Sequence, residues 1–152
     1  SQDTGERTCV ALCTGTWESP MSAPGFECTI RGGGSLIICL STCDPLLQDC
    51  PSNEVCIPNP FGNGFTCVVD ASGNMGTQND PCEYANGCDP GLVCLNPALA
   101  TECDPNAAGC CLPFCDITMP NCTNQGAMCL PWYEVGMAQP GYENVGVCGS
   151  MQ

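Results

Sequence analysis

The fold is decided by the stretch Cys82-Glu-Tyr-Ala-Asn-Gly-Cys88-Asp-Pro-Gly-Leu-Val-Cys94, which leads on to Gly109-Cys110-Cys111-Leu-Pro-Phe-Cys115. Seven cysteines lie within residues 82–115, and turn-forming residues separate most of them. One apolar run, from Leu92 to Leu95, is long enough for a short strand. A segment of this kind buries too little hydrocarbon to fold unaided, so covalent cross-links must hold it.

Cysteine is used throughout the chain at the density of a disulfide scaffold. Eighteen of the 152 residues are cysteine, and the even number allows nine bridges. Thiolate metal sites use Cys-x-Cys or Cys-x-x-Cys pairs, and neither spacing occurs, so we expect no bound metal. Bridges at this density require an oxidising compartment, so we expect a secreted or cell-surface protein whose signal peptide preceded Ser1. The cysteines expected to form disulfides are Cys9, Cys13, Cys28, Cys39, Cys43, Cys50, Cys56, Cys67, Cys82, Cys88, Cys94, Cys103, Cys110, Cys111, Cys115, Cys122, Cys129 and Cys148.

The cysteine spacing divides the chain into tandem units. The second unit reads Cys-x6-Cys-x5-Cys-x10-Cys, and the C-terminal unit repeats its first spacings within one residue before a longer hairpin. The predicted divisions are a polar tail at 1–8, a hairpin unit at 9–42, a second unit at 43–69, a linker at 70–81, a central six-cysteine unit at 82–114 and a C-terminal unit at 115–152. Units of this length imply a string of small cores.

Local patterns predict hairpins and almost no helix. Phe26–Ile30 and Leu36–Leu40 read as one hairpin, whereas the Pro, Ser and Gly content of 14–25 predicts a loop. Phe65–Val69 follows the turn signal Gly62-Asn63-Gly64 in a second hairpin. Helix is limited to about one turn within 97–102. The sequence therefore predicts a small disulfide-rich fold, mostly irregular, with short β-hairpins.

The repeat narrows the possible disulfide pairings without fixing them all. Because a hairpin joins the third and fourth cysteines of a unit, the simplest solution bonds first to third and second to fourth. The six central cysteines should pair among themselves, with adjacent Cys110 and Cys111 directed to different partners. The pairs expected elsewhere are Cys9–Cys28, Cys13–Cys39, Cys43–Cys56, Cys50–Cys67, Cys115–Cys129 and Cys122–Cys148.

The charge balance limits the partners. Two arginines face sixteen carboxylates, with no lysine or histidine, giving a net charge of −14. Such a surface repels phosphates and anionic lipid, so we expect neither nucleic acid nor membrane insertion. The residues that follow cysteine at Asp44, Asp89, Asp104 and Asp116 are expected to cap turns through their side-chain oxygens. Calcium ligation by the same carboxylates is the alternative, although no Asp-x-Asp-x-Asp run occurs.

Missing residue types remove most catalytic chemistry. Without histidine there is no Ser-His-Asp or Cys-His dyad, and without lysine no Schiff base, so we expect no enzyme and no cofactor. The best candidate partner surface is the aromatic and thioether cluster of Trp132, Tyr133, Met137 and Tyr142. The alternative is that these residues fill the core of the last unit.

Several motifs together resemble one family. They include Cys43-Asp-Pro-Leu-Leu-Gln-Asp-Cys50, Cys110-Cys-Leu-Pro-Phe-Cys115 and the closing Pro140-Gly-Tyr-Glu-Asn-Val-Gly-Val-Cys148. The chain resembles, over nearly its whole length, uncharacterised cysteine-rich secreted or lipoprotein-like bacterial proteins of myxobacteria. Members are often longer at the amino end. Some carry the label ribulose-phosphate epimerase, which is rejected here because that activity implies a TIM barrel with histidine metal ligands.

The sequence therefore favours a non-enzymatic extracellular module with a structural or adhesive role, including self-association. The alternative is a ligand-binding or effector module, either a calcium-dependent adhesin or a protease inhibitor that presents a rigid loop such as Pro58–Gly64.

Overall fold

The computed structural model describes residues 14–16, 19–21, 26–31 and 36–151, with side chains from residue 40 onward. Contacts divide the chain into two compact units, residues 1–42 and 43–152. The predicted tail at 1–8, and the predicted bridges Cys9–Cys28 and Cys13–Cys39, lie outside what the structure describes. Each unit is treated separately below.

The first unit contains two short antiparallel pairs. β1 (Thr14–Thr16) pairs with β2 (Ser19–Met21), where the sequence predicted only a loop. β3 (Phe26–Arg31) pairs with β4 (Leu36–Ser41), which confirms the predicted hairpin with one more residue at the end of each strand. In this register Cys28 lies opposite Cys39.

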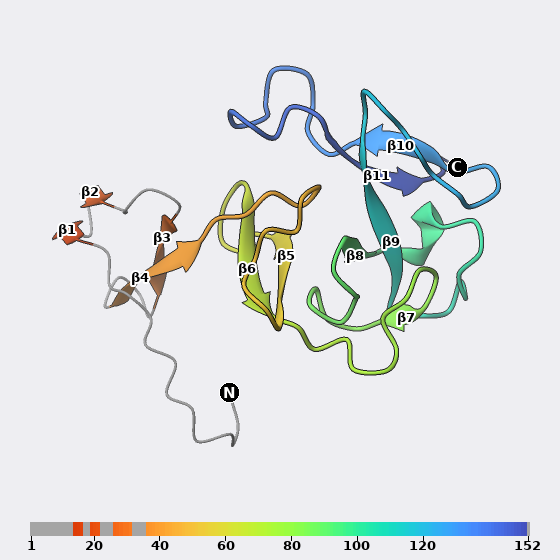
Figure 1. Cartoon of the computed structure of the whole chain (residues 1–152), viewed down its shortest axis with the longest axis horizontal. Coiled ribbons are helices and arrows are strands. Elements are labelled where there is room, and N and C mark those ends of the chain that lie inside the picture. Colours follow the sequence, from red (N-terminus) through yellow and green to blue (C-terminus); the bar gives the residue numbers. More distant parts are fainter. Residues whose placement is uncertain (1–13, 17–18, 22–25, 32–35, 152) are drawn as a thin grey trace. The chain divides into compact units, whose positions relative to one another are not determined.

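Residues 43–152 are built from hairpins and one longer strand. β9 is the central strand: it pairs with β11 through 114–116, with β8 through 110–113 and with β7 through 109–110 (Figure 1). The expected turn of helix is confirmed as a single 3₁₀ turn, Pro97–Leu99. No helix in the described part of the chain has the length and apolarity that a bilayer crossing requires. The strands are β5 (Glu54–Pro58), β6 (Phe65–Val69), β7 (Pro81–Cys82), β8 (Leu92–Leu95), β9 (Gly109–Asp116), β10 (Met128–Pro131) and β11 (Val145–Gly149).

Disulfides hold these hairpins in one repeated pattern. The expected pairs Cys43–Cys56, Cys50–Cys67, Cys115–Cys129 and Cys122–Cys148 are confirmed. The central unit, which the sequence left open, has Cys82–Cys94, Cys88–Cys111 and Cys103–Cys110. If Cys103–Cys110 is set aside as an insertion, the central unit also bonds first to third and second to fourth.

The register of the hairpins explains this pattern. Cys56 lies opposite Cys67 in the β5–β6 pair, Cys94 opposite Cys111 in β8–β9, and Cys129 opposite Cys148 in β10–β11. In every case the two facing cysteines are not bonded to each other. Each bonds instead to a cysteine of the preceding segment, so two bridges fasten that segment to one hairpin.

Adjacent Cys110 and Cys111 are bonded to different partners, as predicted. Both lie in β9, and successive side chains of a strand point to opposite faces of the sheet. Cys110 therefore reaches Cys103 while Cys111 reaches Cys88.

The core of residues 43–152 crosses the predicted units, which corrects the expectation of a string of small cores. One cluster of buried residues includes Phe65 of the second unit, Val93 and Phe114 of the central unit, and Val145 of the C-terminal unit. A smaller cluster surrounds Cys82, Cys88 and Cys111. Pooling apolar side chains in this way lets hairpins that are too small to stand alone share one buried interior.

The segment predicted to be a linker, residues 70–81, is held against the central unit by backbone hydrogen bonds. Ala71 donates to the Asn86 carbonyl at 3.0 Å, and the Asp89 amide donates to the Gly76 carbonyl at 2.8 Å. Asn79 donates to the Cys111 carbonyl at 2.9 Å. These bonds fix the path of the chain between the predicted units 43–69 and 82–114.

The fold is a small disulfide-rich one with short β-hairpins and little helix, as the sequence predicted.

Candidate functional site

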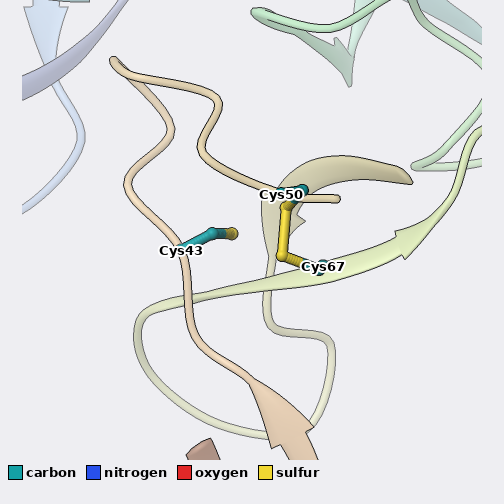
Figure 2. A group of neighbouring side chains, drawn as sticks. All are labelled: Cys43, Cys50 and Cys67. Carbon is teal, nitrogen blue, oxygen red and sulfur yellow. A yellow bond between two sulfur atoms is a disulfide. The ribbon is translucent and has the colours of Figure 1, made fainter. Parts of the chain in front are cut away.

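Among the described residues, nine cysteine sulfurs lie in three groups of three, each with its sulfur atoms within 4.8 Å of one another. Each group consists of one complete disulfide and one sulfur from the neighbouring disulfide. Figure 2 shows the first group, in which the Cys43 side chain points toward the Cys50–Cys67 bridge. The usual metal ligand is a thiolate and not a disulfide sulfur. We therefore interpret these groups as neighbouring disulfides and not as metal sites. The groups are Cys43, Cys50 and Cys67; Cys82, Cys88 and Cys111; and Cys115, Cys122 and Cys148.

Five aromatic rings meet at the start of β6. Phe65 is fully buried, with its ring centroid 5.7 Å from that of Phe114 and 5.1 Å from that of Tyr142. The rings of Trp132 and Tyr133 lie 5.8 and 6.5 Å from Phe65. These separations lie within the range for favourable aromatic pairs. The aromatic cluster therefore joins the loop between β10 and β11 to the β5–β6 hairpin.

Two hydrogen bonds reinforce this junction. The Tyr142 hydroxyl donates to the carbonyl oxygen of Cys43 at 2.9 Å. The Gly64 amide donates to the Tyr133 hydroxyl oxygen at 3.1 Å. The loop between β10 and β11 is consequently anchored at both of its ends to residues about seventy and a hundred positions earlier in the chain.

The structure divides the predicted partner surface. Trp132, Tyr133 and Tyr142 are partly buried and pack against the large core cluster. Met137 is 69% exposed. The neighbouring Val135 is fully exposed, and sequence reasoning missed it because an isolated valine in a loop carries no signal of its own. The aromatics thus form the base of the loop, and Val135 and Met137 lie at its exposed part.

A third exposed apolar side chain lies on the turn that Tyr133 contacts. Phe61 in the β5–β6 turn is 48% exposed. The Asn59 side chain accepts a hydrogen bond from the Phe61 amide at 3.0 Å, and the Asn59 amide donates to the Gly64 carbonyl at 3.0 Å. These two hydrogen bonds close the turn. We define the two-loop surface as Phe61, Val135 and Met137.

The aspartates that follow cysteine cap turns, as the sequence predicted, at three of four positions. Asp44, Asp104 and Asp116 each accept a hydrogen bond from the backbone amide two residues on. For Asp89 a backbone bond, from the Leu92 amide to its carbonyl, closes the turn instead. At Asp116 the Thr118 hydroxyl donates a further bond of 2.6 Å, and these bonds lower the pKa of the carboxyl. Among the described residues, no three carboxylates bring their oxygens within 4.8 Å of one another.

A cleft of about 280 Å³ opens beside Phe114, where Leu46 and Met119 also line it. Of the described residues that line this cleft, Asp116 is the one with a titratable side chain. Its carboxylate already accepts bonds from its own turn. Hydrolysis of glycosides by paired carboxylates needs a second acid at a set distance, which this lining does not supply.

The charged side chains of residues 43–152 are all of one sign. Residues 43–152 hold twelve of the sixteen carboxylates and neither arginine. The carboxylates of residues 43–152 therefore have no lysine or arginine within these residues to pair with. The surface potential of these residues is therefore negative throughout, with Glu134 and Glu143 both exposed on the loop that carries Val135 and Met137.

Comparison of the chain with protein family models, with curated proteins and with solved structures finds no match. The resemblance to cysteine-rich myxobacterial proteins therefore stays a prediction, and the functional argument depends on the geometry described above.

Proposed function

We propose that the protein is a non-enzymatic extracellular module with a structural or adhesive role, and that it contacts a protein partner, including a second copy of itself, through the two-loop surface. The observation that carries this proposal is the exposure of Val135 and Met137 on a loop whose base is fixed by three packed aromatic rings. A rigid loop loses little conformational entropy when it binds, which favours its use as a contact surface.

The disulfide content supports the extracellular part of the proposal. Seven bridges join fourteen cysteines of the described residues, and such bridges persist in oxidising compartments. The missing histidine and lysine, and the single carboxylate in the cleft, support a role without catalysis.

Replacing Val135 and Met137 together by serine tests the proposed surface. We expect binding to immobilised protein and to the producing cell surface to fall by about tenfold or more, because exposed apolar anchors carry much of an interface's free energy. The melting temperature should stay unchanged, since neither side chain is buried. The matched control replaces Met75 and Met151 by serine. These two side chains are 58% and 78% exposed elsewhere in residues 43–152, and the variant should bind as the wild type does.

Salt separates self-association from adhesion to another protein. Because each copy is strongly acidic, self-association should strengthen as salt screens the repulsion, and sedimentation velocity at low and high salt measures this. A wild-type protein that is monomeric at both salts and does not bind cells would contradict the proposal, as would equal losses in the test and control variants.

A further inference from the structure

The methionines of this protein lie in an unusual place. All five whose side chains the structure describes are exposed, at between 55% and 78% of their surface. Methionine is ordinarily among the residues most often buried in protein cores. The five come from separate segments of residues 43–152: Met75, Met119, Met128, Met137 and Met151.

The large core cluster of residues 43–152 correspondingly contains no thioether sulfur. The buried residues of the large cluster are cysteine, phenylalanine, valine, leucine and alanine. The fourteen cysteines of residues 43–151 are all in disulfides, so this part of the chain has no free thiol. Within residues 43–152, the surface thioethers are therefore the sulfur atoms that react first with a dissolved two-electron oxidant.

We propose that these five methionines are sulfoxidation sites that consume two-electron oxidants without cost to the fold. The reaction needs a peroxide: the thioether sulfur gives an electron pair to one peroxide oxygen and the O–O bond breaks. The departing oxygen takes the proton of the transferred one, so the products are methionine sulfoxide and water, or an alcohol from an alkyl peroxide. The sulfoxide adds a polar oxygen to a side chain that is already in water. The disulfides and the aromatic cluster, which hold the fold, do not take part.

This arrangement suits an oxidising compartment. In most proteins sulfoxidation inserts a polar group into a core or an interface and destabilises it. Here the oxidisable groups are outside the core that they would disrupt. The inference does not depend on the proposed adhesion, although oxidation of Met137 would also make the two-loop surface more polar.

Hydrogen peroxide titration of the intact oxidised protein tests the proposal. Peptide mass spectrometry should show all five methionines gaining one oxygen at rates within about threefold of N-acetylmethioninamide, as expected for solvated thioethers. Differential scanning calorimetry of the fully oxidised protein should give a melting temperature within about 2 °C of the untreated protein, a shift typical of surface changes.

The internal control is Leu112→Met, which places a thioether at a position that is 1% exposed. Leucine-to-methionine exchange conserves volume and should keep the fold. We expect Met at position 112 to react at least about tenfold more slowly than the surface methionines, because burial excludes the oxidant. The proposal is overturned if two or more of the five are as protected as this residue, or if oxidation of the wild type lowers its melting temperature clearly.

Discussion

Reduction of the disulfides is expected to unfold residues 43–152. Six of the seven bridges join cysteines 12 to 26 positions apart, and closing a loop of about fifteen residues contributes roughly 3 kcal/mol in the chain-entropy model. The contributions do not add fully, but several together exceed the roughly 5–15 kcal/mol by which a domain is usually stable. Near-ultraviolet circular dichroism in excess dithiothreitol should lose the signal of the packed aromatic rings.

One bridge provides a graded control for this prediction. Cys103–Cys110 spans only 7 positions and has no counterpart in the second and C-terminal units. The variant with both of these cysteines changed to alanine should stay folded under oxidising conditions and lose less stability than the equivalent variant of Cys50 and Cys67. A native spectrum that survives full reduction would show that packing alone specifies the fold.

Phe65→Ala is expected to be the most damaging single apolar substitution. Phe65 is fully buried among four other rings, and removing a buried phenylalanine typically costs about 3–5 kcal/mol. The loss should also release the loop between β10 and β11, whose aromatic base packs on this ring. Urea denaturation under oxidising conditions measures the change in the free energy of unfolding.

Phe61→Ala is the matched control, since it makes the same chemical change four residues earlier at a half-exposed position. We expect it to cost less than about 1 kcal/mol, as surface substitutions usually do. Equal losses in the two variants would mean that the aromatic cluster does not join the units as described.

The β3–β4 and β5–β6 hairpins, and four of the seven described cross-links, could be predicted from the sequence because they follow from local spacing. The turn glycines before Phe65 and the regular intervals from Cys43 to Cys67 specify a hairpin with two cysteines facing each other. The central unit resisted prediction because its insertion adds two further cysteines between the third and fourth of the pattern. Three bridges among six cysteines allow fifteen pairings, and spacing alone does not choose among them.

The shared core could not be predicted, because it depends on contacts between units that are distant in sequence. Trp132 and Tyr142 read equally well as a partner surface or as the core of the last unit. The structure places them instead against Phe65 of another unit. β9 was also missed as a central strand, since Pro113 and three cysteines obscure its β pattern.

Mapping the disulfides of the native protein tests the central claim most directly, namely that each hairpin of residues 43–152 is fastened by two bridges to the segment before it and by none across its own strands. Digestion without reduction, stepwise reduction and alkylation in acid, and fragmentation mass spectrometry can separate even adjacent Cys110 and Cys111. Within residues 43–152 the predicted result is seven bridges, Cys43–Cys56, Cys50–Cys67, Cys82–Cys94, Cys88–Cys111, Cys103–Cys110, Cys115–Cys129 and Cys122–Cys148. A bond between facing cysteines, such as Cys56–Cys67 or Cys129–Cys148, or free thiols among these fourteen residues, would contradict it.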